Sequence, residues 1–246
     1  MDEKRDYIIG MRSVNEALES GKEIEKVLFK PGLEGTQFRA LCEELKKRNI
    51  PFQFVPVEKL NSFSKGNHQG VVAITSMIDY VSVEQIIDKV GKGEGIPLIM
   101  MLDGVSDVKN FGAIARSAEC SGAAGIILPA KGGAAINAEA VKSSAGALLR
   151  LPVARVPNLR IAIYQLKEAG FLITGADEKA EQQIYDIDFT KPCALVMGSE
   201  EKGISDSVKT LLDQRCRIPL LGRIGSLNVS VASAVIMFEA VRQRGV

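Results

Sequence analysis

The chain reads Gly198-Ser-Glu-Glu-Lys-Gly-Ile-Ser205 in one stretch and Ile218-Pro-Leu-Leu-Gly-Arg-Ile-Gly-Ser-Leu-Asn-Val-Ser-Val-Ala232 in another. An apolar strand pattern at 194–197 precedes the first stretch. A shorter strand pattern at 215–218 runs into the second, which then opens a long apolar helix. Open α/β sheets bind ligands at the carboxyl ends of their strands, and helix N-termini carry N–H groups without intrahelical partners. Two strand ends and one helix start therefore predict a small-molecule pocket.

The composition indicates a globular protein and excludes several classes. The 246 residues are 46% hydrophobic and 25% charged, which suffices for a buried core. No apolar run reaches the roughly 20 residues that a membrane-spanning helix needs. The one histidine argues against His-based metal sites and against a Ser-His-Asp triad, so we expect no metal. The net charge is only +1, so a nucleic-acid partner would have to meet a local basic patch.

The expected compartment is the cytoplasm. The charged start Met1-Asp-Glu-Lys-Arg-Asp6 leads into no signal-like apolar region. The cysteines are scattered and form no C-x-x-C pair, which is typical of thiols in a reducing environment. They are Cys42, Cys120, Cys193 and Cys216.

The order of strand and helix patterns predicts two α/β domains. Residues 1–76 read as a small domain, with strand patterns at 25–30, 52–55 and 71–76. Residues 77–96 read as a linker, which ends in the flexible composition Gly91-Lys-Gly-Glu-Gly95. Residues 97–246 show strand patterns at 98–102, 125–128, 153–156, 171–174, 194–197 and 215–218. Continuous apolar strands separated by helices predict a parallel sheet that helices cover on both faces.

Three polar patterns follow strands in this second domain. Asn110-x-Gly112-x-x-x-Arg116 opens a helix, although a capping asparagine and a solvated arginine explain its spacing at least as well as a catalytic role does. Gly198-x-Glu200-x-x-Gly203 also fits a turn whose carboxylate caps the next helix, and Ser226-Leu-Asn228 fits an ordinary helix cap. The P-loop and G-x-G-x-x-G fingerprints are missing from these stretches. The occurrence of all three patterns in order favours a functional site.

Together these patterns resemble the three motifs of the SpoU/TrmH (SPOUT) family of RNA 2′-O-ribose methyltransferases, which use S-adenosylmethionine. The resemblance covers roughly residues 98–244, and the pattern around Ser226-Leu-Asn-Val-Ser-Val-Ala232 is the most specific part of it. At the N-terminus, Tyr7-Ile-Ile-Gly10 and His68-Gln-Gly-Val-Val-Ala73 resemble the substrate-binding domain of the subgroup that methylates a guanosine of 23S rRNA.

The resemblance implies a fold and a set of site residues. It implies a parallel-sheet catalytic domain with a carboxyl-terminal deep trefoil knot, an N-terminal RNA substrate-binding domain, and a homodimer with the active site near the subunit interface. It implies that the catalytic residues are Asn110, Arg116, Glu200, Ser226 and Asn228. It implies that the residues holding S-adenosylmethionine are Met197, Gly198, Ile218, Leu220, Ser226, Leu227 and Val229.

The expected substrate is RNA, and three alternatives for the function stay open. The first is methylation of 23S rRNA, the second is methylation of a tRNA ribose by the same chemistry, and the third is a non-catalytic RNA-binding or ribosome-assembly protein. In the first domain the candidate RNA contacts lie in the polar loop before Val71. They are Lys65, Asn67, His68 and Gln69, and His68 alternatively only braces the turn.

Overall fold

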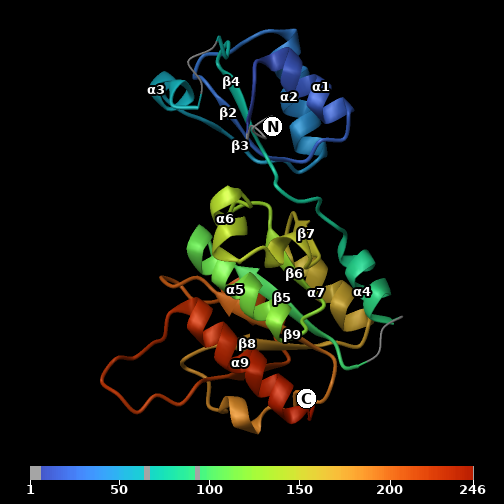
Figure 1. The fold of residues 1–246 in the computed structure, drawn as a ribbon, viewed down its shortest axis with the longest axis vertical. Helices are drawn as coiled ribbons and strands as arrows, with labels where there is room; N and C mark the ends of the chain where they lie inside the picture. Colours follow the sequence, from blue (N-terminus) through green and yellow to red (C-terminus); the bar gives the residue numbers. More distant parts are fainter. Residues whose placement is uncertain (1–6, 64–66, 92–94, 246) are drawn as a thin grey trace. The chain divides into compact units, whose positions relative to one another are not determined.

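The structure of the chain is a computed structural model that describes residues 7–63, 67–91 and 95–245. The chain divides into two compact units. The first comprises the residues up to Asp79 together with Ala135–Ala138, and the second comprises Tyr80–Ala134 and the residues from Glu139 onward. Each unit has its own sheet, and the chain is coloured from its N-terminus to its C-terminus in Figure 1.

The first unit is a small α/β unit built on a mixed 4-stranded sheet with the strand order β1-β4-β2-β3. Strand β4 pairs antiparallel with β1 and β2, and β3 is parallel to β2. The elements in chain order are β1 (Tyr7–Ile9), α1 (Met11–Glu19), β2 (Ile24–Phe29), α2 (Thr36–Lys47), β3 (Phe52–Phe54), α3 (Val57–Asn61) and β4 (Val71–Thr75).

Alternating side chains bury both faces of this sheet. Val27 and Phe29 of β2 pack in one apolar cluster with residues of α1 and α2, such as Leu41. Leu28, between them, points to the opposite face and packs in a second cluster with Leu60 of α3. The predicted strands in this unit are confirmed to within a residue or two, whereas the sequence analysis did not anticipate helix α3.

The second unit is built on a 6-stranded sheet with the strand order β10-β8-β9-β5-β6-β7, in which every neighbouring pair is parallel. Its strands are β5 (Leu98–Asp103), β6 (Gly125–Pro129), β7 (Val153–Val156), β8 (Leu172–Ala176), β9 (Cys193–Gly198) and β10 (Gln214–Cys216). Its helices are α4 (Val83–Gly91), α5 (Val108–Cys120), α6 (Ala138–Ser143), η1 (Ala147–Leu149), α7 (Leu159–Glu168), η2 (Ile184–Asp186), α8 (Asp206–Lys209) and α9 (Val229–Gln243).

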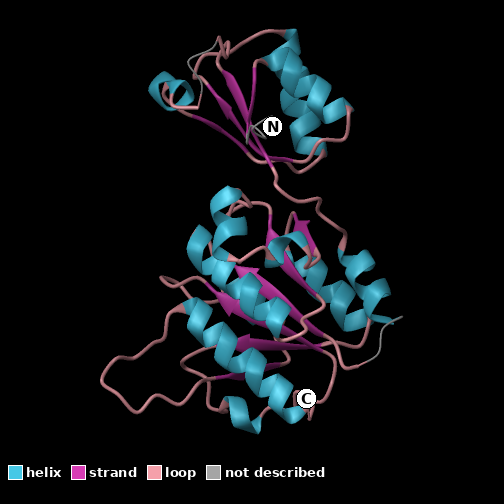
Figure 2. Ribbon diagram, viewed as in Figure 1, coloured by secondary structure: helices cyan, strands magenta, loops and turns pink. Residues whose placement is uncertain are grey.

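Helices cover both faces of the parallel sheet, as the apolar strands predicted (Figure 2). Ile99 and Met101 of β5 belong to a core cluster that includes buried residues of α4, α7 and α8. The intervening Met100 is also fully buried and, by alternation, faces the other side. On that side α5 and α9 lie against each other, as Figure 1 shows. Within the segment expected to be a linker, Val83 and Ile86 of α4 contribute to the core of this unit.

All six predicted strands of the second unit are present, and one of them is shorter than predicted. Strand β10 ends at Cys216, whereas the sequence pattern extended it to Ile218. Arg217 instead forms an isolated bridge with Gln183, in the segment between β8 and β9. The chain from there to α9 runs out from the second unit as a long loop (Figure 1).

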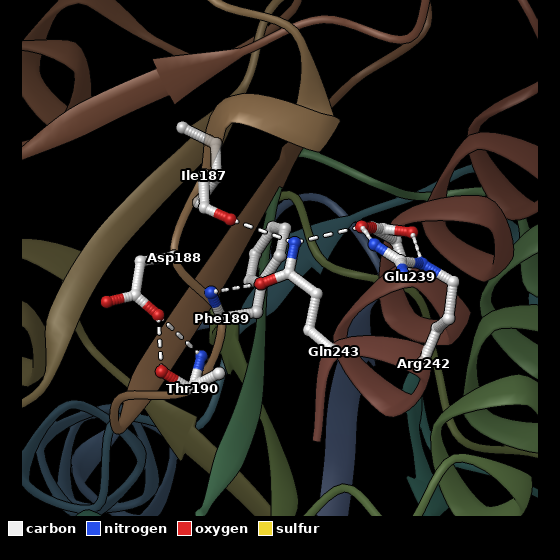
Figure 3. Close-up of polar contacts among 7 residues, drawn as sticks. All are labelled: Ile187, Asp188, Phe189, Thr190, Glu239, Arg242 and Gln243. Atoms are coloured by element: carbon white, nitrogen blue, oxygen red, sulfur yellow. Dashed lines mark hydrogen bonds and ion pairs between the residues drawn. The ribbon is translucent and has the colours of Figure 1, made fainter. Parts of the chain in front are cut away.

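The end of α9 is bonded to the chain between β8 and β9, as Figure 3 shows. The Gln243 side-chain Nε2 donates to the Ile187 carbonyl at 2.9 Å, and its Oε1 accepts from the Phe189 N–H at 2.9 Å. Nε2 also donates to Glu239 at 2.8 Å. Glu239 is nearly buried and accepts from Arg242 through both carboxylate oxygens, at 2.8 and 2.7 Å. These bonds fix the C-terminal helix to a segment more than fifty positions earlier in the chain.

This arrangement predicts acid sensitivity at Glu239. The hydrogen bond from Arg242 lowers the pKa of Glu239 below its ordinary value of 4.5. The stabilisation is therefore fully present above the unfolded-state pKa and is lost as the pH falls through the lower folded-state pKa. We expect Glu239→Gln to lower the free energy of unfolding at pH 7 and to have a shrinking effect below about pH 4.

Urea denaturation of both proteins at a series of pH values measures this difference. Glu168→Gln, at an exposed carboxylate of α7, controls for the loss of one negative charge. If the difference in the free energy of unfolding between wild type and Glu239→Gln did not change with pH, the lowered pKa of Glu239 would be contradicted.

Candidate functional site

The carboxyl ends of three neighbouring strands and the start of α9 enclose one pocket of about 430 Å³. Its walls come from the residues after β8, β9 and β10 and from the loop that leads into α9. Its volume lies within the range of about 300–1,000 Å³ that is usual for small-molecule sites. The pocket therefore lies where parallel α/β sheets bind ligands.

The structure brings all the residues predicted to hold the cofactor to the wall of this pocket. The end of β9 contributes Met197 and Gly198. The remaining ones belong to the loop after β10 and to the start of α9, and they are Ile218, Leu220, Ser226, Leu227 and Val229.

Part of the pocket wall was not predicted from the sequence. The residues directly after β8 also line the pocket, and so do Lys209, Ala232 and Ile236. Apart from Ala232, which belongs to the pattern Ser226–Ala232, these residues carry no recognisable pattern. The signal for 176–179 was the strand order, since β8 lies between β9 and β10, and a single sequence does not reveal that order.

Three side chains from distant segments form one hydrogen-bonded network. The Glu200 Oε1 accepts from the Nδ2 of Asn110 at 2.7 Å and from the Nδ2 of Asn228 at 3.0 Å. The Asn228 Nδ2 also donates to the Asn110 Oδ1 at 3.1 Å. Glu200 and Asn228 line the pocket, so the network forms part of its rim.

Helix capping explains why the side chains of Asn110 and Asn228 have different hydrogen-bonding roles. The N-cap of α5 is Asp107, whose carboxylate accepts from the Asn110 N–H at 2.8 Å, so the alternative that Asn110 is the cap is wrong. The Asn110 side chain is therefore free to reach Glu200. Asn228 is the N-cap of α9, and its Oδ1 accepts from the Ser230 N–H at 2.9 Å while its Nδ2 serves the network.

The structure does not bring Arg116 to the pocket of the same chain. Arg116 is exposed on α5 and does not belong to the pocket wall. Six positions along an α-helix correspond to a rotation of about 600°, so Arg116 and Asn110 lie about 120° apart around α5. Among the described residues, the Arg116 guanidinium has no hydrogen-bond or ion-pair partner within the chain.

The turn that carries Glu200 is closely packed. Ser199 and Gly203 exchange backbone hydrogen bonds of 3.1 and 2.8 Å across it. A Cβ atom on Gly198 would lie 2.1 Å from the Gly203 carbonyl carbon and 2.2 Å from the Ile204 nitrogen. Only glycine fits at position 198 because the turn folds back on its own backbone.

The charges around the pocket are mixed, and its thiol is inert. Carboxylates and cations alternate along the wall: Asp177, Glu178, Lys179, Glu200, Glu201, Lys202, Lys209 and Arg217. Cys216 also lines the pocket, and burial raises the pKa of its thiol to about 12. The thiol is therefore protonated at neutral pH and is unsuited to act as a nucleophile.

In the first unit, the structure places His68 as a brace of the turn. The ring is buried, its Nδ1 accepts from the Gly70 N–H at 3.0 Å, and its Nε2 lies 2.9 Å from the Asn61 Oδ1. Both ring nitrogens are thus occupied within the chain, so His68 is not available for an RNA contact. Lys65 lies outside the described residues, and Asn67 and Gln69 lie in the same loop.

In 7–63, 67–91 and 95–245, no helix is long and apolar enough to cross a membrane. The same ranges contain no group of three or more His, Cys, Asp or Glu side chains placed to hold a metal ion.

Comparison with known proteins adds two family matches and close relatives. Residues 97–238 match the SpoU rRNA Methylase family, and residues 7–81 match a family described as RNA 2'-O ribose methyltransferase substrate binding. A protein of Staphylococcus haemolyticus (strain JCSC1435), named provisionally as a TrmH family tRNA/rRNA methyltransferase, is 35% identical over 237 residues, 96% of this chain and 95% of that protein. The similarly named YacO of Bacillus subtilis (strain 168) is 34% identical over 244 residues, 99% and 98% of the two chains.

Solved structures show the same similarity. The SpoU methyltransferase AviRb from Streptomyces viridochromogenes, in complex with the cofactor AdoMet, is 29% identical with a TM-score of 0.60, covering 97% of this chain and 90% of that one. The AdoMet-bound rRNA methyltransferase from Sinorhizobium meliloti is 27% identical with a TM-score of 0.62, covering 98% and 88%.

The packing of the turn predicts that alanine destabilises the protein at position 198 but not at position 222. Gly198→Ala places a methyl group against the backbone of Gly203 and Ile204, so we expect it to cost about 1–3 kcal/mol or more of stability and to displace Glu200. Gly222→Ala meets no atom within 4 Å and should leave the stability unchanged. Thermal denaturation measures both. Equal melting temperatures of the two variants would show that the turn is not fixed by this contact.

Proposed function

Because the chain belongs to the SpoU/TrmH family of RNA methyltransferases, we propose that it transfers a methyl group from S-adenosylmethionine to a ribose 2′-hydroxyl of RNA. The observation that carries the proposal is the network of Asn110, Glu200 and Asn228 at the rim of the strand-end pocket. Family membership supports methyl transfer to tRNA or rRNA. The network and the pocket support an intact catalytic site rather than a protein that only binds RNA.

The pocket has the chemistry that S-adenosylmethionine requires. This ligand combines a flat purine, a positively charged sulfur and an amino acid group. Apolar walls from Leu220, Leu227 and Ile236 suit the purine, and the carboxylates of Asp177 and Glu200 suit the positive groups. The neighbouring solved structures with AdoMet bound support the same ligand. We therefore assign Met197, Gly198, Ile218, Leu220, Ser226, Leu227 and Val229 to its binding.

When bound, S-adenosylmethionine supplies a methyl group that is already activated by the charged sulfur, so the chain must align the hydroxyl and help to remove its proton. Glu200 and Asn228 form the polar rim with Ser226 beside them, and Asn110 orients Glu200. Arg116 contacts the phosphate next to the target ribose and stabilises the developing negative charge on its oxygen. A guanidinium offers N–H donors and no acceptor, so Arg116 is not the base.

Because Arg116 lies away from the pocket of its own chain, we propose that the protein acts as a homodimer. Helix α9 buries one face against α5, while Val231, Val235 and Phe238 on its opposite side are exposed at helical spacing. A second copy of the chain covers this apolar stripe. Arg116 on the adjoining α5 then lies near the subunit interface and serves a site that one chain does not complete.

We also propose that the C-terminal segment is threaded as a deep trefoil knot, as the family resemblance implies. Three observations support threading. The chain leaves the sheet edge at β10, returns to pack α9 against α5, and bonds its end to Ile187 and Phe189 between β8 and β9.

The first unit carries the RNA in this proposal. The family match of residues 7–81 to substrate binding supports this division. The specific substrate we propose is a guanosine of 23S rRNA, in a cytoplasmic enzyme. The names of the relatives include both tRNA and rRNA, so a tRNA ribose is the alternative that the following experiment separates.

The proposed function predicts one missing modification. RNA from cells that lack this protein should lose a single 2′-O-methyl group, and mass spectrometry of nuclease fragments should place it on a guanosine of 23S rRNA. A missing methyl group on tRNA would establish the alternative substrate. Unchanged methylation of both RNAs, with no transfer by the purified protein, would contradict the proposed function.

The role of Arg116 predicts a loss of turnover without a loss of cofactor binding. We expect Arg116→Ala to reduce methyl transfer by roughly 10²–10³-fold, the usual cost of removing one donor to a developing oxyanion. Arg116→Lys should not restore activity, because an ammonium group cannot make the planar two-point contact. Calorimetry should show that S-adenosylmethionine affinity changes only a few-fold. Near-normal turnover of Arg116→Ala would reject the assignment.

The apolar stripe on α9 predicts a dimer that a single charge disrupts. Phe238→Glu should convert the protein from dimer to monomer in sedimentation velocity, because it places a carboxylate in the covered face. Tyr164→Glu, at an aromatic side chain on α7 with similar exposure, is the matched control and should stay dimeric. A wild-type protein that is monomeric at micromolar concentration would exclude this face as the interface.

A further inference from the structure

Asp103 is a charged residue at the end of a strand that is otherwise apolar. Strand β5 reads LIMMLD, so every residue before Asp103 is apolar and Asp103 is the charged residue at its end. It pairs in register with Gly198, the last residue of β9. Its Oδ2 accepts from the Ser205 N–H at 2.7 Å, although the two residues are 102 positions apart. This carboxylate therefore holds the far end of the turn that carries Glu200.

The end of β5 contacts both ends of that turn. At its start, Asp103 pairs in register with Gly198, and a Cβ atom added to the following Gly104 would lie only 3.4 Å from the Cβ of Ser199. At its end, Asp103 holds Ser205, next to the buried Ile204. Among the described residues, Asp103 is the only charged side chain that accepts a hydrogen bond from the backbone of this turn. Such bonds are about twice as strong as neutral ones.

We propose that Asp103 is a positioning residue, which fixes the turn 198–205 so that the Glu200 carboxylate meets the side-chain amides of Asn110 and Asn228. The inference rests on the proposed function, because it gives the network its catalytic purpose. Asp103 itself does not line the pocket, and its effect passes through Glu200. An asparagine at this position keeps an oxygen that can accept from Ser205, whereas an alanine does not.

The first test observes the network directly and needs no activity. In ¹H–¹⁵N spectra of the full chain, the side-chain amide signals of Asn110 and Asn228 should shift or broaden in Asp103→Ala and return toward wild type in Asp103→Asn. Asp213→Ala is the matched control, since Asp213 also accepts a backbone N–H, from Ile173 at 2.8 Å, but away from the pocket. Unchanged amide signals in Asp103→Ala would overturn the proposal.

The second test is a double-mutant cycle on methyl transfer. Asp103→Ala should lower kcat by roughly ten- to a hundred-fold, as small misplacements of catalytic groups do, with a smaller change in KM. In a Glu200→Gln background the same substitution should change kcat less than about two-fold, because residues that act through one group are not additive. An equal loss in both backgrounds would show that Asp103 does not act through Glu200. If the wild type transfers no methyl group to RNA, the proposed function fails, and the spectra still decide the role of Asp103.

Discussion

The second unit depends on one carboxylate that joins three segments of chain. Glu200 accepts from Asn110 and Asn228, which lie 90 residues before it and 28 residues after it. Each asparagine stands at the beginning of a helix, and the two helices, α5 and α9, pack against each other. The network thus fixes the relation between the turn after β9 and the two helix starts. Glu200 and Asn228 in turn form part of the pocket wall.

Much of the fold could be predicted from the sequence because its causes are local. The strands of the second unit are short apolar runs, and a parallel sheet buried on both faces requires such runs. The pocket itself could be predicted because two strand patterns end there and a helix begins there, whereas the cofactor roles of residues 197, 198 and 226–229 came from the resemblance to the SpoU/TrmH motifs. The strand order was not predictable, since pairing of β8 with both β9 and β10 is a long-range contact.

Other features could not be read from the sequence because two residues compete for one role. Asp107 and Asn110 are both good N-caps three positions apart, and only the structure shows that Asp107 caps α5. Gly198 and Gly222 cannot be told apart from the sequence alone. A Cβ atom on Gly198 would meet the backbone of its own turn, whereas a Cβ atom on Gly222 would meet no atom within 4 Å.

The position of β10 at the sheet edge has a consequence for synthesis of the protein on the ribosome. A chain that has emerged only as far as β9 has most of its sheet but lacks two of the pocket's walls, because β10 and α9 come after β9 in the chain. Domains often begin to fold while their C-terminal parts are still being translated. The wall of the pocket is therefore complete only after α9 has been made and has packed in place, so occupancy of the pocket reports that α9 has folded.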